Sequence, residues 1–131
     1  DTGQLIGSVG FVPTFFALEL LRHFRDTDEP PTHVCSTPEF GVFYAFGEEY
    51  RGRGYATEAV RAMGDYAFRV LNVKRIVCNT GRDNTASARM MERIGMTVFR
   101  NASGHPPRMD VIGVLENPSP APADSVGFCI G

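Results

Sequence analysis

The sequence predicts an α/β domain, and two adjoining patterns carry that prediction. In residues 40–46, FGVFYAF, large apolar residues alternate with smaller ones, which is the period of a strand with one buried face. From Tyr55 onward the period becomes that of a helix, with apolar residues on one side and charged residues on the other. A chain of 131 residues with 43% hydrophobic residues is long enough for one domain with its own core.

The first third of the chain predicts one strand and a long connection. Residues 4–12 have strand periodicity, and Pro13 is expected to end that strand. Residues 14–26, TFFALELLRHFRD, fit either a short amphipathic helix or an extended aromatic segment. Residues 26–39 contain three prolines and predict a loop. So long a connection is either a cover for a binding site or a surface excursion that caps the core.

A glycine- and arginine-rich turn, RGRG at 51–54, separates the central strand from the helix predicted over 54–71. The first amides of a helix lack internal partners and carry positive potential, and glycines let an anion approach them. The turn is therefore a predicted site for a phosphate or pyrophosphate. A P-loop is excluded because its spacing and lysine are absent. The dinucleotide fingerprint begins at Gly52 and Gly54, but Thr57 occupies its third glycine position.

The second half of the chain continues with alternating strand and helix signals. Asn84 has the residue type of a helix N-cap, and Gly95 is a typical C-terminal stop. The pattern places the domain at 1–115 and a Pro/Ser/Ala-rich tail at 116–131. The remaining predicted elements are a strand at 74–80, a helix at 84–94 and an antiparallel pair at 96–100 and 109–115.

Composition narrows the classes of function. A formal charge of -2 and a pI near 5.9 show no excess of basic residues of the kind that binds nucleic acid. No apolar run approaches the length of a membrane span. Cys35, Cys78 and Cys129 are odd in number and widely separated, which argues against a disulfide framework and predicts a cytoplasmic setting. Cys78, in mid-strand, is expected to be a small core residue rather than a nucleophile.

Two motifs together resemble a known enzyme superfamily. RGRGYA at 51–56 is similar to the [Q/R]-x-x-G-x-[G/A] pyrophosphate loop of the GNAT acetyltransferases. DNTASARMMERIGM at 83–96 resembles the N-x-x-S-x-x-x-x-E-x-x-G-[F/M] segment of the ribosomal-protein-alanine N-acetyltransferase (RimJ/RimL-like) branch. The resemblance runs from about residue 3 to about residue 115. Two motifs in the right order make a stronger signal than either one alone.

The resemblance implies a fold, a reaction and a cofactor site. It implies a GNAT-like mixed, mainly antiparallel sheet with two main helices, and transfer of an acetyl group from acetyl-CoA directly to a primary amine. The central strand would splay from its neighbour, so that its backbone could pair with the pantetheine arm and support the oxyanion. No metal is implied, and a homodimer is compatible with the family. The implied cofactor-binding residues are Phe46, Gly47, Arg51, Gly52, Arg53, Gly54, Tyr55, Ala56, Asn84 and Ser87.

Three residues are candidates for catalysis. In the family reading Ser87 lies near the thioester sulfur, where it could protonate the departing thiolate; its alternative role is an ordinary residue of the first helical turn. Glu48 and Glu49 stand where some members of the branch carry a carboxylate that deprotonates the amine. Their alternative role is that of solvated turn residues. Relatives outside the branch use a tyrosine from the helix at 84–94, and this chain has none there.

Two rival functions remain open from the sequence. One is a CoA-binding or interaction module without catalysis, because the family's first strand, two helices and second strand have no counterpart here. The other is a phosphate-binding turn for a different nucleotide. The chain begins at Asp1 without methionine, which suggests a fragment or a misplaced gene boundary. The acceptor, whether a protein N-terminus, a polyamine or a small amine, cannot be read from the sequence.

Overall fold

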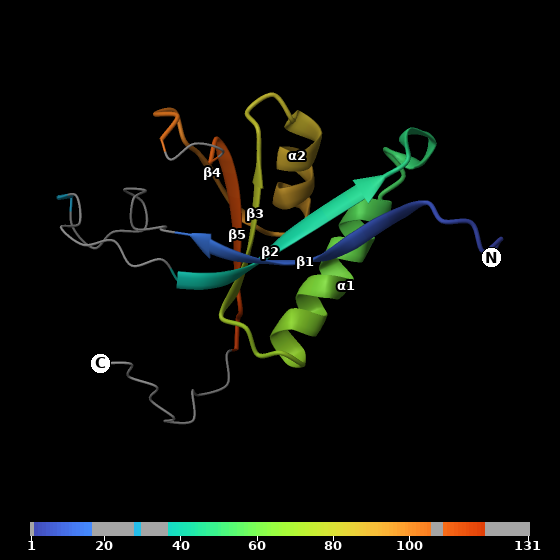
Figure 1. Ribbon diagram of the computed structural model, residues 1–131, viewed down its shortest axis with the longest axis horizontal. Coiled ribbons are helices and arrows are strands. Elements are labelled where there is room, and N and C mark those ends of the chain that lie inside the picture. The colour runs from blue at the N-terminus through green and yellow to red at the C-terminus, as the bar shows by residue number, and fades with distance from the viewer. Residues whose placement is uncertain (1, 17–27, 30–36, 106–108, 120–131) are drawn as a thin grey trace.

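The computed structural model describes residues 2–16, 28–29, 37–105 and 109–119. These residues form a five-stranded sheet in the order β1-β2-β3-β5-β4, together with two helices (Figure 1). Only β2 and β3 run parallel, so the expected mixed, mainly antiparallel sheet is confirmed. The elements are β1 (Gly7–Phe16), β2 (Thr37–Phe46), a 3-10 turn (Glu48–Tyr50), α1 (Tyr55–Arg69), β3 (Arg75–Thr80), α2 (Thr85–Arg93), β4 (Thr97–Arg100) and β5 (Val111–Glu116).

The prediction that Pro13 ends the first strand was wrong. β1 continues to Phe16 and pairs with β2 along its whole length. Pro13 lies opposite Phe40, at a position where the backbone of β1 faces away from β2, as the alternation of an antiparallel ladder requires. Because β1 is an edge strand, the N–H that proline lacks would have had no strand to bond. A proline is therefore tolerated there.

The predicted loop at 26–39 was also wrong at its end, because 37–39 belong to β2. Pairing with β1 extends the strand through these residues, although Pro38 and Glu39 have low strand propensity. Of the segment 14–26, residues 14–16 are extended. Residues 17–26 lie outside the described residues, so the choice between a helix and an extended segment there stays a prediction. The same holds for the role of the connection as a cover for a binding site.

Both helices pack on one face of the sheet. Val42 of β2 and Ile76 of β3 are buried on that face against Val60 of α1 and Met91 of α2. The alternation predicted for 40–46 is confirmed, since Phe43 points to the opposite face and is 47% exposed. Apolar area removed from water in this way is the main stabilising contribution to the fold.

The central helix begins where the sequence places it and ends slightly earlier. α1 starts at Tyr55 and ends at Arg69, with Val60, Gly64 and Ala67 buried. Val70 and Leu71, which the helix predicted over 54–71 included, lie beyond the last turn and are exposed. Among the described residues, neither helix has the length and apolar character needed to cross a bilayer.

The end of the last strand is fixed to the start of β3. β5 extends to Glu116, one residue beyond the predicted strand. Asn117 is buried; its side chain donates to the Val73 carbonyl at 3.0 Å and its backbone N–H donates to the Lys74 carbonyl at 2.8 Å. The first residues of the predicted tail are therefore part of the fold, and 120–131 lie outside the described residues.

Candidate active site

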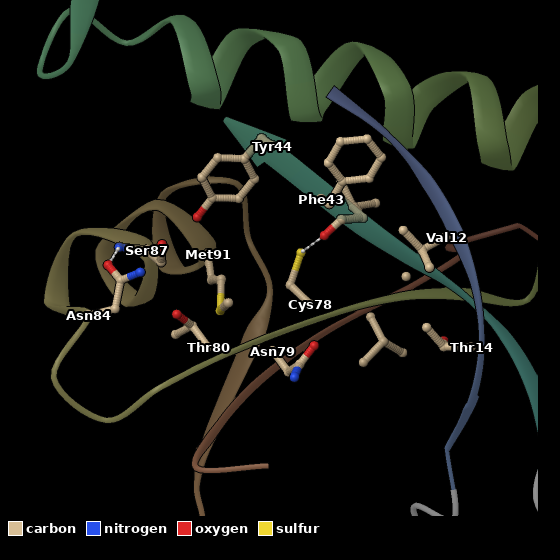
Figure 2. A pocket seen from close by; sticks show the side chains of 13 residues that line it. Val12, Thr14, Phe43, Tyr44, Cys78, Asn79, Thr80, Asn84, Ser87 and Met91 are labelled. Carbon is tan, nitrogen blue, oxygen red and sulfur yellow. Dashed lines mark hydrogen bonds between the residues drawn. The ribbon is translucent and has the colours of Figure 1, made fainter. Parts of the chain in front are cut away.

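The central strands β2 and β3 separate within the sheet. Their parallel register covers only Phe40↔Ile76 and Gly41↔Val77, whereas β2 continues alongside β1 to Phe46. The splay that the family resemblance implies is therefore present. A cleft of about 310 Å³ opens between the two strands (Figure 2). It is lined by Val12, Thr14, Gly41, Val42, Phe43, Tyr44, Val77, Cys78, Asn79, Thr80, Asn84, Ser87 and Met91.

The backbone of β2 presents polar groups to this cleft. The Gly47 N–H donates to the Ile6 carbonyl at 3.0 Å, which shows that Gly47 faces β1. Successive residues of an antiparallel strand alternate in direction, so the N–H and C=O groups of Tyr44 and Phe46 face the β3 side. The Val42 carbonyl, two residues earlier, accepts from the Cys78 thiol at 3.3 Å and confirms this direction. Tyr44 and Phe46 lie beyond the paired part of β3, so an extended ligand could bond to them.

The glycine turn leads directly into α1, as predicted. Gly52 and Gly54 have φ values of 75° and 85°, and no atom lies within 4 Å of a Cβ built on either residue. Gly54 is the N-cap and offers no side chain to the first helical amides. The N–H groups of Tyr55 and Ala56, in the first turn, are thus available to an anion.

The two arginines of the turn are exposed. The Arg51 guanidinium lies 3.7 Å from the Glu48 carboxylate, and both side chains are largely in solvent. The Arg53 guanidinium lies 6.0 Å above the Tyr50 ring centroid. Exposed contacts of this kind are weak, so either arginine can turn toward a phosphate at little cost.

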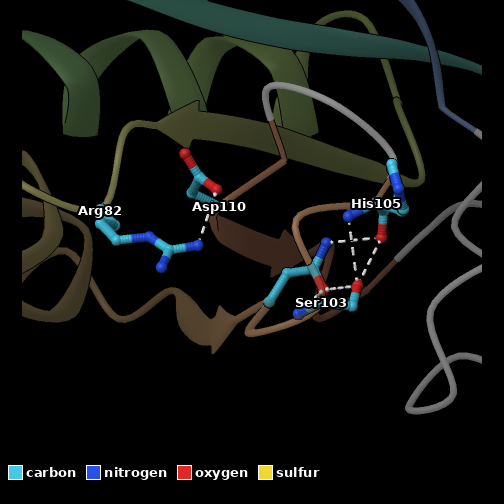
Figure 3. Close-up of polar contacts among 5 residues, drawn as sticks. Arg82, Ser103, His105 and Asp110 are labelled. Atoms are coloured by element: carbon cyan, nitrogen blue, oxygen red, sulfur yellow. Dashed lines mark hydrogen bonds and ion pairs between the residues drawn. The ribbon is translucent and has the colours of Figure 1, made fainter.

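Asn84 caps α2 at the mouth of the cleft. Its Oδ1 accepts from the Ser87 N–H at 3.1 Å, as predicted for an N-cap. The turn before it is held by the Asn84 N–H, which donates to the Gly81 carbonyl at 3.1 Å. Arg82 in that turn pairs with Asp110 at 3.4 Å, beside the β4–β5 loop (Figure 3). These contacts fix the position of Asn84 and Ser87, and both residues line the cleft.

The β4–β5 loop that adjoins this ion pair has its own polar network. The Asn101 side chain donates to the His105 carbonyl at 2.8 Å, and the Ser103 hydroxyl donates to the same carbonyl at 2.9 Å (Figure 3). None of these three residues lines the cleft. The network stabilises the loop rather than a site.

The two helices are also joined directly. The Arg61 guanidinium on α1 donates to the Arg93 carbonyl at the C-terminal end of α2. Orphan carbonyls at a helix end favour a cationic donor of this kind. This contact joins the middle of α1 to the C-terminal end of α2.

Glu48 and Glu49 lie outside the cleft. Both belong to the exposed 3-10 turn, and neither is among the lining residues. Glu48 faces Arg51 instead. The described lining contains no carboxylate, so the structure does not bring these two predicted residues together with Ser87.

Tyr44 is the site residue that sequence reasoning missed. Its side chain points from β2 toward Ser87 on α2 (Figure 2). The hydroxyl is buried and has no hydrogen-bond partner of normal geometry among the described residues. Burial raises the pKa of Tyr44 above its ordinary 10.0, although the nearby Ser87 hydroxyl acts to lower it. The sequence did contain a signal for Tyr44. It is the one large residue on this face of the strand with a hydroxyl, since the others are Phe40, Val42 and Phe46.

Cys78 also reaches the cleft, and the prediction that it is a core residue is confirmed. The side chain is 3% exposed, and burial raises the pKa of its thiol to about 11 from an ordinary 9.0. A thiol of this kind is largely protonated at neutral pH and is a poor nucleophile.

This pKa shift predicts a loss of stability at high pH. The folded state binds the Cys78 proton more tightly than the unfolded state, so the contribution is complete below pH 9 and is lost as pH rises toward 11. The full difference is about 2–3 kcal/mol. Urea unfolding between pH 8 and 11 should show a steeper decline for the native chain than for Cys78→Ala. Equal slopes for the two proteins would contradict the prediction.

Comparison with known proteins decides the family. The model of the acetyltransferase (GNAT) domain matches residues 1–97. The chain belongs to the GNAT acetyltransferase family. It is 34% identical over 77 residues to the uncharacterized N-acetyltransferase YnaD of Bacillus subtilis, covering 55% of this chain and 45% of that protein. This GNAT domain thus spans about half the length of the relatives it matches.

Solved structures support the same fold. An acetyltransferase from Agrobacterium tumefaciens superposes with a TM-score of 0.62 at 28% identity, over 88% of this chain and 56% of that one. A ribosomal-protein-S5-alanine acetyltransferase from Vibrio fischeri superposes with a TM-score of 0.59 at 20% identity, over 89% and 57% of the two chains. At that identity the second likeness concerns the fold alone. The GNAT fold predicted from the sequence is confirmed.

Proposed function

We propose that this GNAT domain moves an acetyl group from acetyl-CoA to a primary amine by direct attack of the amine in a ternary complex. The observation that carries the proposal is the splay of β2 from β3, which leaves the backbone of Tyr44 facing a cleft and that of Phe46 beyond the paired part of β3 on the same side. Asn84, the N-cap of α2, lines that cleft, and the Gly54 turn begins α1, the helix that follows β2.

The residues present fit the parts of acetyl-CoA. The amides at the start of α1 would hold the pyrophosphate, with Gly52 and Gly54 admitting it and Arg51 and Arg53 adding positive charge. The β2 backbone at Phe46 would pair with the pantetheine arm, and Gly47, whose N–H donates to the Ile6 carbonyl, would contact the arm from the end of the strand. Asn84 and Ser87 would contact its far end, and one cleft-facing β2 amide would stabilise the oxygen that gains negative charge.

The cleft performs the chemistry by placing two reactants together. The amine nitrogen attacks the acetyl carbon, the carbon–sulfur bond breaks, and its electron pair goes to sulfur. Glu48 and Glu49 remain proposals for the base, acting through water, because the described cleft lining holds no carboxylate. The RimJ/RimL-like branch and a cytoplasmic location stay part of this proposal, as does the acceptor class.

Acetyl-CoA binding and turnover together test the proposal. Calorimetry should detect acetyl-CoA binding that excess coenzyme A abolishes and excess ATP does not. Thiol release should follow with at least one of three amines, which are spermidine, tyramine and a peptide whose first residue is alanine. No heat with acetyl-CoA would overturn the proposal, and displacement by ATP would favour a different nucleotide.

A second candidate is a CoA-binding module without catalysis. The absence of a carboxylate from the described lining favours it, because an ammonium must lose a proton before it attacks. Binding of acetyl-CoA without thiol release across all three amines would select this alternative.

Asn84 allows capping and cofactor contact to be measured separately. Asn84→Ala should lower the free energy of unfolding by about 1 kcal/mol, because the Ser87 N–H loses its acceptor. Asn84→Ser keeps a capping oxygen and should retain stability, while it shortens the side chain that reaches the cleft. We expect both variants to bind acetyl-CoA more weakly by calorimetry. Full affinity in Asn84→Ser would limit Asn84 to its capping role.

A further inference from the structure

The buried hydroxyl of Tyr44 makes no regular hydrogen bond within the described fold. Buried polar groups in proteins are nearly always hydrogen-bonded, and each exception calls for an explanation. The Tyr44 Oη has no partner of normal geometry among the described residues, although its ring packs against the core that joins β2 to the helices. A phenylalanine would pack equally well and would bury no unsatisfied oxygen.

The surroundings of this hydroxyl keep it protonated. The cleft residues that approach it from the other elements are Cys78 of β3 and Ser87 of α2, and the described lining contains no charged side chain. Burial is the main cause of the raised pKa of Tyr44, and Cys78 acts in the same direction. The phenol is therefore a neutral hydrogen-bond donor at physiological pH, held at the edge of the cleft.

Ser87 is placed to assist the loss of that proton. Its backbone N–H is fixed by the Asn84 cap at 3.1 Å, so the side chain leaves a defined point of the first helical turn. Its hydroxyl lowers the pKa of Tyr44, as a donor to the phenolate oxygen would. Two hydroxyls from different elements thus meet where β2 separates from β3 (Figure 2).

We propose that Tyr44 is a catalytic residue that donates its proton to the thiolate leaving group, and that Ser87 is a positioning residue that stabilises the resulting phenolate. This assignment rests on the proposed acetyl transfer and replaces Ser87 as the direct proton donor. The position agrees with the cleft-facing backbone of the same residue, which would hold the ligand arm beside the ring.

The amine nitrogen bonds to the acetyl carbon, and the carbon–sulfur bond breaks with its electron pair going to sulfur. Tyr44 Oη gives its proton to that sulfur and becomes a phenolate, which accepts a hydrogen bond from Ser87. The proton that the amine nitrogen loses returns to Tyr44 through solvent, so that amide and thiol leave and the tyrosine is restored.

Tyr44→Phe tests the role with a readout that requires no turnover. The ultraviolet absorbance of the thiolate gives the pKa of the thiol of bound coenzyme A. A donor beside the sulfur stabilises the thiolate, so this pKa should rise by about one to two units in Tyr44→Phe. Tyr66→Phe, which alters an exposed tyrosine on α1, is the matched control and should leave it unchanged.

Kinetics supply the second readout. With an amine that supports turnover, Tyr44→Phe should lower kcat about a hundredfold or more and leave the KM for acetyl-CoA within about twofold. Ser87→Ala should lower kcat less than Tyr44→Phe does. Thermal unfolding of Tyr44→Phe should occur at the native temperature or above, because the variant buries no orphan oxygen.

The outcomes separate this role from the proposed function. An unchanged thiol pKa in Tyr44→Phe overturns the role of Tyr44, whether or not the native chain turns over. A kcat within twofold of native in Tyr44→Phe overturns it as well. Failure of the native chain to bind coenzyme A overturns the proposed function and this role together. A thiol pKa that rises equally in Tyr44→Phe and Tyr66→Phe also counts against a specific donor.

Discussion

Valine in place of Gly54 is expected to weaken acetyl-CoA binding about tenfold to a hundredfold. Gly54 has a φ of 85° at the start of α1, a region that β-branched residues avoid. Valine would shift the turn toward other backbone angles, and the amides of Tyr55 and Ala56 would no longer converge on one anion. The loss of one hydrogen bond to a charged group is enough for an effect of this size.

Gly104→Val provides the matched control for that experiment. Gly104 also has a positive φ, 69°, and open space around a Cβ, but it lies in the β4–β5 loop. Both variants should lose about 1–2 kcal/mol of unfolding free energy from backbone strain. Only Gly54→Val should lose affinity in calorimetry. Equal affinity losses would show that strain alone is responsible, and no loss in Gly54→Val would remove the turn from the site.

Ile76→Ala should produce the largest loss of stability, about 2–5 kcal/mol. Ile76 is fully buried near the start of β3, and its side chain packs on α1 near Gly64. It also belongs to one of the two residue pairs that join β2 to β3. The cavity left by alanine would therefore weaken the core. It would also weaken the closed end of the cleft, which is the short region where β2 and β3 pair.

Urea denaturation measures this effect directly. Val70→Ala is the control, because Val70 is 62% exposed beyond the end of α1 and should change the unfolding free energy by less than about 0.5 kcal/mol. A loss below about 1 kcal/mol in Ile76→Ala would mean that the core collapses around the missing atoms. In that case the closed end of the cleft would not depend on Ile76.

Local periodicity made most of the elements predictable. The strand at 40–46 and the start of α1 at Tyr55 follow from the spacing of apolar residues, and the cap at Asn84 follows from one side chain and the amide three residues on. Each signal lies within one element. The sequence alone was sufficient for them because no distant partner decides the outcome.

The errors arose where a distant partner decides the outcome. Pro13 remains in a strand because β1 is at the sheet edge, and residues 37–39 become a strand because β1 pairs with them. Neither fact is visible in a local window. Likewise, the strand pattern at 40–46 counts Tyr44 only as an apolar residue. The fold is needed to show that its hydroxyl lies beside Ser87 without a hydrogen-bond partner of normal geometry.

The site was predictable in part, and mostly through resemblance. The glycine turn suggests an anion from its residues alone, whereas the separation of β2 from β3 was expected only from the family. The location of Glu48 could not be foreseen, because the neighbouring Arg51 offers it a partner in solvent. Long charged side chains in exposed turns have several such alternatives, and the sequence does not rank them.

The short junction between β2 and β3 divides the sheet into two half-sheets, β1-β2 and β3-β5-β4. An extended ligand arm that bonds to β2 within the gap would serve as a partial sixth strand, and its occupancy would then be linked to folding. At a ligand concentration one hundred times its Kd, that linkage adds about 2.7 kcal/mol to the unfolding free energy. In the proposed function the acyl carrier would therefore stabilise the native state as well as take part in the reaction.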